Sequence, residues 1–232
     1  MEKKYDMFLT IILIVSIIAI VVLVGFWLYD MYSKNRVEQD ALDAIEEFNR
    51  QIGIEDGQGE NNVIEANLTP IEPAQEPEEP QQEPDTNTSE GKSSGKTNYD
   101  KYKNFTILGH IEIPKTKVNY PVLAEISPSA LNVAVAQLYG PGLNQVGNTI
   151  IIGHNNRNGL FFSNNKKLNN GDTIYITDLE GNRIPYTIYN IYKTTDTDTD
   201  YMTRDTHGAR EISLSTCTDD GKLRLIIWAK AE

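Results

Sequence analysis

An uncharged apolar run near the amino terminus constrains this chain more than any other feature. The run covers residues 7–29, is dominated by Ile, Val and Leu, and ends in Phe-Trp-Leu-Tyr. A helix of this length, at about 1.5 Å per residue, crosses a hydrocarbon core of ~30 Å. A cleaved signal peptide would have a shorter apolar core, and the terminal aromatic residues suit a membrane interface. We therefore predict an uncleaved transmembrane anchor over residues 7–29. The basic residues on its two sides, Lys3 and Lys4 before it and Lys34 and Arg36 after it, are nearly balanced, and they only slightly favour a cytoplasmic tail over residues 1–6.

The residues after this run have the spacing of an amphipathic helix. Apolar side chains recur at steps of three and four, at Val37, Ala41, Ile45, Phe48 and Ile52. We predict a juxtamembrane helix over residues 30–54 that lies on or near the bilayer. A dimerising helix is the alternative, although its apolar seam would be short.

Residues 55–98 have a composition that cannot build a core. Five prolines are interleaved with Glu and Gln, a Gly/Ser/Lys run follows, and the segment holds 11 acidic and 2 basic residues. Low hydrophobicity and high charge leave too little apolar surface to offset the entropy of ordering. We predict a disordered linker that acts as a spacer between the anchor and the rest of the chain.

The acidic character of the chain is confined to its first 98 residues. The net charge is −12, yet residues 99–232 carry 14 acidic and 14 basic residues. No basic patch is evident, so we expect no nucleic-acid partner. The chain has one cysteine, which excludes an intrachain disulfide and leaves a thiol that is either buried and inert or functional.

From residue 99 onward the sequence is typical of β-structure. We expect a short helix through residues 131–135, capped by Ser127, and one or two helical turns within residues 161–168. Strands are expected at residues 106–113, 117–123, 148–153, 173–177, 183–193, 211–217 and 223–229. About eight short strands at regular spacing favour a closed or sandwiched β-architecture, in one domain over residues 99–232.

The single cysteine stands in a stretch suited to acyl transfer. Cys217 ends an apolar strand, a polar turn follows, and a second strand carries Arg224. A cysteine nucleophile needs a base or a cation nearby, and a tight turn would bring the arginine next to the thiol. The alternative is an arginine on a solvated strand face.

Three histidines are candidates for the base. His110 lies within a predicted strand and is expected to be a packed or exposed strand residue, and His207 lies in a polar loop. His154 ends the apolar strand Ile-Ile-Ile-Gly and opens a polar loop, which is a favourable position for a catalytic group. It could equally anchor the loop by a hydrogen bond.

Together these residues resemble the sortase family. The run SLSTC at residues 213–217 is similar to the family's TLxTC signature, with Ser213 in place of the first threonine. Ile-Gly-His ending at His154 resembles the segment with the sortase histidine, and the strand of Arg224 resembles the one with the family's arginine. The likeness covers residues 105–230.

The resemblance implies a mainly β fold, an eight-stranded sortase-type β-barrel, displayed outside a Gram-positive cell by a single-pass anchor. It implies a cysteine transpeptidase in which Cys217 attacks an LPxTG-like sorting signal and forms a thioacyl enzyme. His154 would be the general acid and base, and Arg224 would stabilise the oxyanion. The implied partners are secreted proteins with C-terminal sorting signals, a peptidoglycan precursor amine, and membrane lipid around the anchor. A cysteine peptidase and a surface binding module with a vestigial site are the alternatives.

The family resemblance also bears on subclass and cofactor. A single N-terminal anchor, and 16 residues between Thr194 and Glu211, predict a class A- or D-like enzyme. The alternating Asp196, Asp198 and Asp200 do not form an EF-hand, because the residues at the required glycine and terminal glutamate positions differ. Some sortases bind an activating Ca²⁺ through loop carboxylates, so a weak Ca²⁺ site is the alternative to solvated loop residues. We expect no cofactor.

Overall fold

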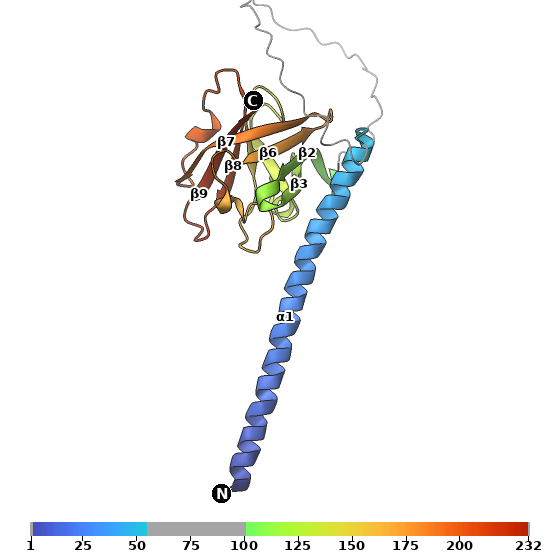
Figure 1. Cartoon of the computed structure of the whole chain (residues 1–232), viewed down its shortest axis with the longest axis vertical. Coiled ribbons are helices and arrows are strands. Elements are labelled where there is room, and N and C mark those ends of the chain that lie inside the picture. Colours follow the sequence, from blue (N-terminus) through green and yellow to red (C-terminus); the bar gives the residue numbers. More distant parts are fainter. Residues whose placement is uncertain (1, 55–100, 232) are drawn as a thin grey trace, which may run out of the picture.

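The computed structural model describes residues 2–54 and 101–231, so the predicted linker over residues 55–98 lies outside the described residues. The described chain consists of one long helix, α1 (Glu2–Gln51), and a β-barrel that lies beside the second half of this helix (Figure 1). The helix is continuous from the predicted anchor into the predicted juxtamembrane segment. It is the one helix of the described chain that is long and apolar enough to cross a membrane.

The barrel is a single sheet in the order β1-β2-β3-β4-β5-β8-β9-β7-β6, closed by pairing between β2 and β6. Eight strands, β2 to β9, therefore form the closed barrel, and the short β1 lies outside it. The strands are β1 (Lys101–Tyr102), β2 (Phe105–Ile113), β3 (Val118–Leu123), β4 (Val135–Tyr139), β5 (Gly147–Ile152), β6 (Thr173–Asp178), β7 (Arg183–Thr194), β8 (Arg210–Cys217) and β9 (Arg224–Ala231). The predicted eight-stranded barrel is confirmed.

The short helical elements differ from the prediction in one place. Helix α2 (Pro128–Leu131) is a single turn in which Ser127 accepts a hydrogen bond from the backbone N–H of Ala130. The predicted helix capped by Ser127 is present, but its predicted extent through residue 135 is wrong, because Val135 already begins β4 and pairs in parallel with Val122 of β3. The remaining short helices are 3-10 turns: η2 (Pro114–Thr116), η3 (Asn165–Lys167) and η4 (Asp200–Met202).

The alternation of side chains along β8 and β9 separates the barrel core from an outer face. Ile212 and Leu214 belong to the main core cluster inside the barrel. A second cluster contains Ile150, Tyr201 and Ile226, and it lies between the strands and the loop that includes η4. By the same alternation Cys217 and Arg224 lie on the side of this second cluster, and so on the outer face of the sheet.

Helix α1 packs against the barrel. Ala41, Ile45 and Phe48 are buried, and the Nζ of Lys103 lies 2.8 Å from a carboxylate oxygen of Asp40. The juxtamembrane helix, which we predicted to lie on or near the bilayer, buries its apolar stripe on the barrel. An apolar stripe of this width serves either surface, and the barrel offers a complementary apolar patch beside β3.

The contacts along α1 fix which end of the barrel is closer to the predicted anchor. Lys34 lies against Gly159, in the loop after β5, and Ile52 lies against Gly181, in the turn between β6 and β7. The end of β5 therefore lies on the anchor side. The carboxyl end of β9 lies at the opposite end of the barrel from the N-terminus of α1 (Figure 1), and β8 runs antiparallel to β9. Cys217 therefore also lies at the anchor-side end.

Candidate active site

The register between β8 and β9 places Arg224 directly opposite Cys217. The connecting turn is closed by hydrogen bonds from the Thr218 N–H to the Leu223 carbonyl at 2.9 Å and from the Gly221 N–H to the Thr218 carbonyl at 2.8 Å. Within this hairpin an Nη1–H of Arg224 donates to the Cys217 sulfur over 2.8 Å. A permanent cation thus contacts the only thiol, an arrangement that stabilises a thiolate or a nearby oxyanion.

His154 reaches the same place from β5. This strand pairs in parallel with β8, and Ile152 lies opposite Ser215. Parallel strands end at the same edge, so His154, two residues beyond Ile152, emerges beside Cys217. Both side chains and Arg224 line one cavity of about 440 Å³. The structure therefore brings together all three residues that the sequence singled out.

Two contacts hold the histidine segment against the cysteine strand. The Thr216 hydroxyl donates to the Gly153 carbonyl over 2.7 Å, and the Gly153 N–H donates to the Ser215 carbonyl over 3.3 Å. A Cβ on Gly153 would lie 2.8 Å from a methyl group of Val135 and 2.9 Å from the Phe162 ring. Gly153 lets the two segments come close together, and the hydrogen bond from Thr216 holds them there. The positions of Cys217 and His154 are therefore coupled through the residues that precede them.

Asn155 is a site residue that the sequence did not single out. Its amide Nδ2 donates to the Cys217 carbonyl over 2.9 Å and to an Asp219 carboxylate oxygen over 2.9 Å. Lys166 forms an ion pair with the same Asp219 at 2.6 Å. The loop after His154 is thereby fastened to the turn after Cys217. The only signal in the sequence is the position of the asparagine directly after the histidine.

Cys217 lies between two cavities. The larger one, which holds His154 and Arg224, has apolar walls from Leu131, Leu138 and Tyr201. The second has a volume of about 250 Å³ and is lined by Asn155, Phe162, Lys166, Lys193, Leu223, Leu225 and the residues from Thr216 to Asp220. Cys217 is therefore a wall residue of both cavities.

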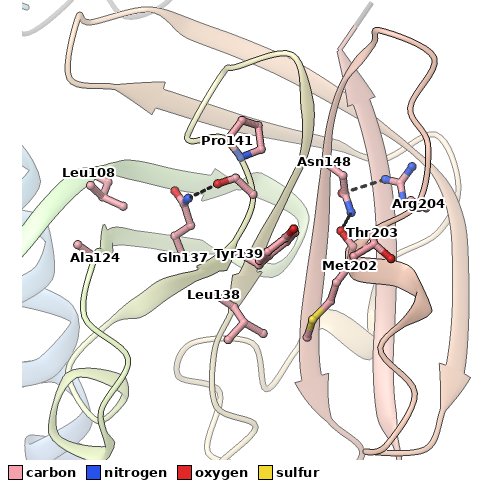
Figure 2. A pocket seen from close by; sticks show the side chains of 11 residues that line it. Leu108, Ala124, Gln137, Leu138, Tyr139, Pro141, Asn148, Met202, Thr203 and Arg204 are labelled. Atoms are coloured by element: carbon pink, nitrogen blue, oxygen red, sulfur yellow. Dashed lines mark hydrogen bonds between the residues drawn. The ribbon is translucent and has the colours of Figure 1, made fainter. Parts of the chain in front are cut away.

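A groove of greater volume adjoins the cavity that holds His154 and Arg224. This distal groove has a volume of about 700 Å³ and shares Leu138 and Met202 with the cavity at Cys217. Figure 2 shows Leu108 and Ala124 at one side of it, Asn148 and Arg204 at the other, and the Tyr139 ring between them.

The other two histidines lie away from the cavities at Cys217. His207 is exposed, and its Nδ1 lies 3.0 Å from a carboxylate oxygen of Asp205. His110 is 8% exposed, and its ring packs edge-on against Phe48 of α1 at 6.1 Å. Burial, together with the nearby Arg183 cation, lowers the pKa of His110 to about 4.

We expect the stability of the protein to fall on mild acidification because of His110. The folded pKa of about 4 lies below the ordinary value of 6.5, so the unfolded chain binds more protons between these pH values. The free energy of unfolding should therefore drop by about 2–3 kcal/mol from about pH 7 to about pH 4.5. Urea unfolding at the two pH values measures this loss. His110→Leu should remove most of this loss and His207→Leu should not. An equal loss of unfolding free energy between the two pH values in both variants would contradict the prediction.

The aspartates after β7 make local contacts. Asp198 accepts hydrogen bonds from the Thr194 hydroxyl and from the Asp200 N–H at 3.0 Å, and these bonds lower its pKa. Over residues 2–54 and 101–231, no group of three or more His, Cys, Asp or Glu side chains is arranged to hold a metal ion.

Comparison with known proteins gives one family. A sequence model described as "Sortase domain" matches residues 111–232, which is more than half of the chain. Sortase A of Bacillus anthracis is 29% identical over 124 residues, 52% of this chain and 58% of that protein, so the chain spans less than two thirds of this curated relative.

A solved lid mutant of sortase A from Corynebacterium diphtheriae superposes with a TM-score of 0.51 at 25% identity, over 55% of this chain and 71% of that one. Sortase C1 from Streptococcus suis gives 0.50 at 26% identity, over 54% and 73%. These relatives carry different class letters, and a class A- or D-like enzyme stays a prediction. The chain belongs to the sortase family.

Proposed function

We propose that this protein is a membrane-anchored cysteine transpeptidase that joins secreted proteins bearing an LPxTG-like sorting signal to a cell-wall amine. The observation that carries the proposal is the contact of Arg224 with the Cys217 sulfur at 2.8 Å, in a cavity that His154 also lines. Nucleophile, cation and acid–base group from three strands meet there, as acyl transfer requires.

The first half of the reaction makes a thioacyl enzyme. The Cys217 sulfur, after giving its proton to His154, attacks the carbonyl carbon of the Thr–Gly-type bond, and a C–S bond forms as the carbonyl oxygen becomes an oxyanion. Arg224 has further N–H groups beyond the one on sulfur, and these stabilise that oxyanion. His154 protonates the leaving amine as the C–N bond breaks.

The second half transfers the acyl group. An incoming amine attacks the thioester, His154 accepts its proton, and the C–S bond breaks to return Cys217. The position of Cys217 in the walls of both cavities supports this sequence: the acyl chain stays in the larger cavity, and the amine enters through the smaller one. Every step uses side chains alone, and we propose that the enzyme needs no cofactor.

Mass spectrometry of the full chain with a library of LPxTG-like peptides and an amine acceptor tests the proposal. We expect a thioacyl adduct on Cys217 and an amine-linked product, both absent from Cys217→Ala. Hydrolysed product alone would indicate a cysteine peptidase. Absence of any adduct across the library would favour a binding module and contradict the proposal.

We further propose that the catalytic domain lies outside the cell with its active-site end toward the bilayer. The contact between Lys34 and Gly159 supports this orientation, since Lys34 follows the predicted anchor by five residues, or roughly 7 Å of helix. An enzyme held this way meets acyl donors and amines that are themselves at the membrane.

The single cysteine makes this orientation measurable. A fluorophore on Cys217 of the liposome-bound chain should transfer energy efficiently to labelled lipid headgroups. The same fluorophore on Glu180→Cys in a Cys217→Ala background, at the far end of the barrel, should transfer less. Phe48→Asp should release the barrel from α1 and reduce the difference. Equal transfer from both positions in the unaltered helix would contradict the proposal. Labelling of Cys217 by an impermeant maleimide on intact cells tests the extracellular location.

A further inference from the structure

One edge of β4 is open beside the distal groove. Strand β3 pairs only with Val135 and Ala136, and the following residues of β4 pair with β5 alone among the described strands. The groove lies along this part, because Gln137, Leu138 and Tyr139 all line it. An extended peptide can be held on such an edge by main-chain hydrogen bonds, with its side chains in flanking pockets.

The distal groove lies within reach of a peptide bound at Cys217. Asn148 lines the distal groove and Ile152 lines the cavity at Cys217, and both belong to β5. Four residues of strand span about 13 Å at ~3.3 Å per residue. A linear peptide in the catalytic cavity therefore enters the distal groove after about four residues.

The chemistry of the groove suits an uncharged polypeptide. Apolar groups of Leu108, Pro141 and Met202 alternate with amide and hydroxyl groups. The charge of Arg204 is already paired, since it contacts the Glu211 carboxylate and donates to the side-chain Oδ1 of Asn148 over 3.1 Å. The side chain of Gln137 is held at the groove by the hydrogen bond from its Nε2 to the Gly140 carbonyl over 3.3 Å, which leaves the main chain of β4 as the peptide-binding element.

The order of bond making decides which part of the substrate stays. The acyl portion, on the N-terminal side of the cleaved bond, remains on Cys217 through both half-reactions, whereas the leaving portion must vacate for the amine. The larger cavity and its 700 Å³ extension suit the portion that stays, and the 250 Å³ cavity suits the portion that exchanges.

We infer that the distal groove binds the segment of the substrate protein immediately N-terminal to the sorting motif, as an extended chain along the open edge of β4. This inference rests on the proposed transpeptidase function and extends it: the enzyme recognises more sequence than the motif. The exposed ring of Tyr139, which is 54% accessible, is the main apolar contact for that segment.

Peptide length tests the inference. A motif-only peptide is compared with one extended by about six uncharged residues on its N-terminal side, which adds roughly 20 Å of extended chain at ~3.3 Å per residue. We expect the extension to raise kcat/KM about tenfold through KM, since burying roughly 55 Å² of apolar surface is worth that factor at ~25 cal/mol per Å². Tyr139→Ala should reduce this advantage below about threefold, since it removes most of that area. Tyr139→Phe should preserve it, and Leu179→Ala, at an exposed site in the turn after β6, should leave it unchanged.

A binding measurement separates failure of the inference from failure of the proposed function. Anisotropy of both labelled peptides with the Cys217→Ala chain reports affinity without any chemistry. Tighter binding of the extended peptide that Tyr139→Ala abolishes supports the inference, even if no peptide is cleaved. Equal affinity of the two peptides, or an extension effect that Tyr139→Ala leaves intact, overturns it, even if both peptides are cleaved.

Discussion

Arg224→Lys should lower kcat/KM for peptide cleavage by about 10²–10³-fold, the range found when one oxyanion donor is removed. Arg224 already places one N–H on the Cys217 sulfur at 2.8 Å, and the same side chain, which carries further N–H groups in a rigid fork, lines the cavity at Cys217. Lysine keeps the charge but concentrates it on one flexible ammonium group, which cannot serve sulfur and oxyanion together. Steady-state cleavage of an LPxTG-like peptide measures the loss.

A matched substitution and a second readout make this prediction specific. Arg210→Lys, at the opposite end of β8 from Cys217, makes the same chemical change and should leave kcat/KM within about threefold, as expected for a substitution that removes no oxyanion donor. The rate of Cys217 alkylation by a small haloacetamide should fall much less in Arg224→Lys than cleavage does, if the arginine acts mainly on the oxyanion. An unchanged rate of cleavage in Arg224→Lys would contradict the assigned role. Equal losses in alkylation and cleavage would indicate that Arg224 stabilises the thiolate of Cys217 and not the oxyanion.

The adjacency of cysteine and arginine could be predicted because it is local. A short polar turn between two apolar strands predicts a hairpin, and the observed register pairs Cys217 with Arg224. Most of the other strands could likewise be predicted from their apolar runs and the turns that bound them. Strand β4 was not, because Val135–Tyr139 is only five residues long and has no strong alternation.

The remaining features depend on contacts between distant segments. His154 joins the site through the parallel pairing of β5 with β8, and spacing along the chain does not encode which strands pair in parallel. The docking of α1 escaped prediction for a similar reason: the stripe that contains Ala41 and Phe48 fits a bilayer or a protein equally well. The burial of His110 follows from that docking, since Phe48 covers its ring. The distal groove likewise appears only when β4 and the loop around η4 lie side by side.

His154→Asn should lower kcat for amide substrates by about 10²–10⁴-fold, the usual contribution of general acid–base catalysis. Asparagine keeps a polar side chain at the end of β5, yet it cannot give a proton to the leaving amine or take one from the incoming amine. The loss should depend on the leaving group. A thioester or activated ester of the same acyl sequence leaves without protonation, so Cys217 acylation by it should be slowed far less than acylation by the amide.

Burst kinetics with the amide and ester pair separate proton transfer from mere positioning. If His154 only shaped the cavity, His154→Asn would slow acylation by both substrates to the same extent, and that outcome would contradict an acid–base role. Transfer from the preformed thioacyl enzyme to an amine should also be slow in this variant, because the incoming amine must still lose a proton. His207→Asn provides the matched control: its side chain is exposed and pairs with Asp205, so both substrates should react at the unaltered rate. A leaving-group-dependent loss at His154, absent at His207, would show that the base of this site comes from β5, the strand whose pairing the sequence alone could not predict.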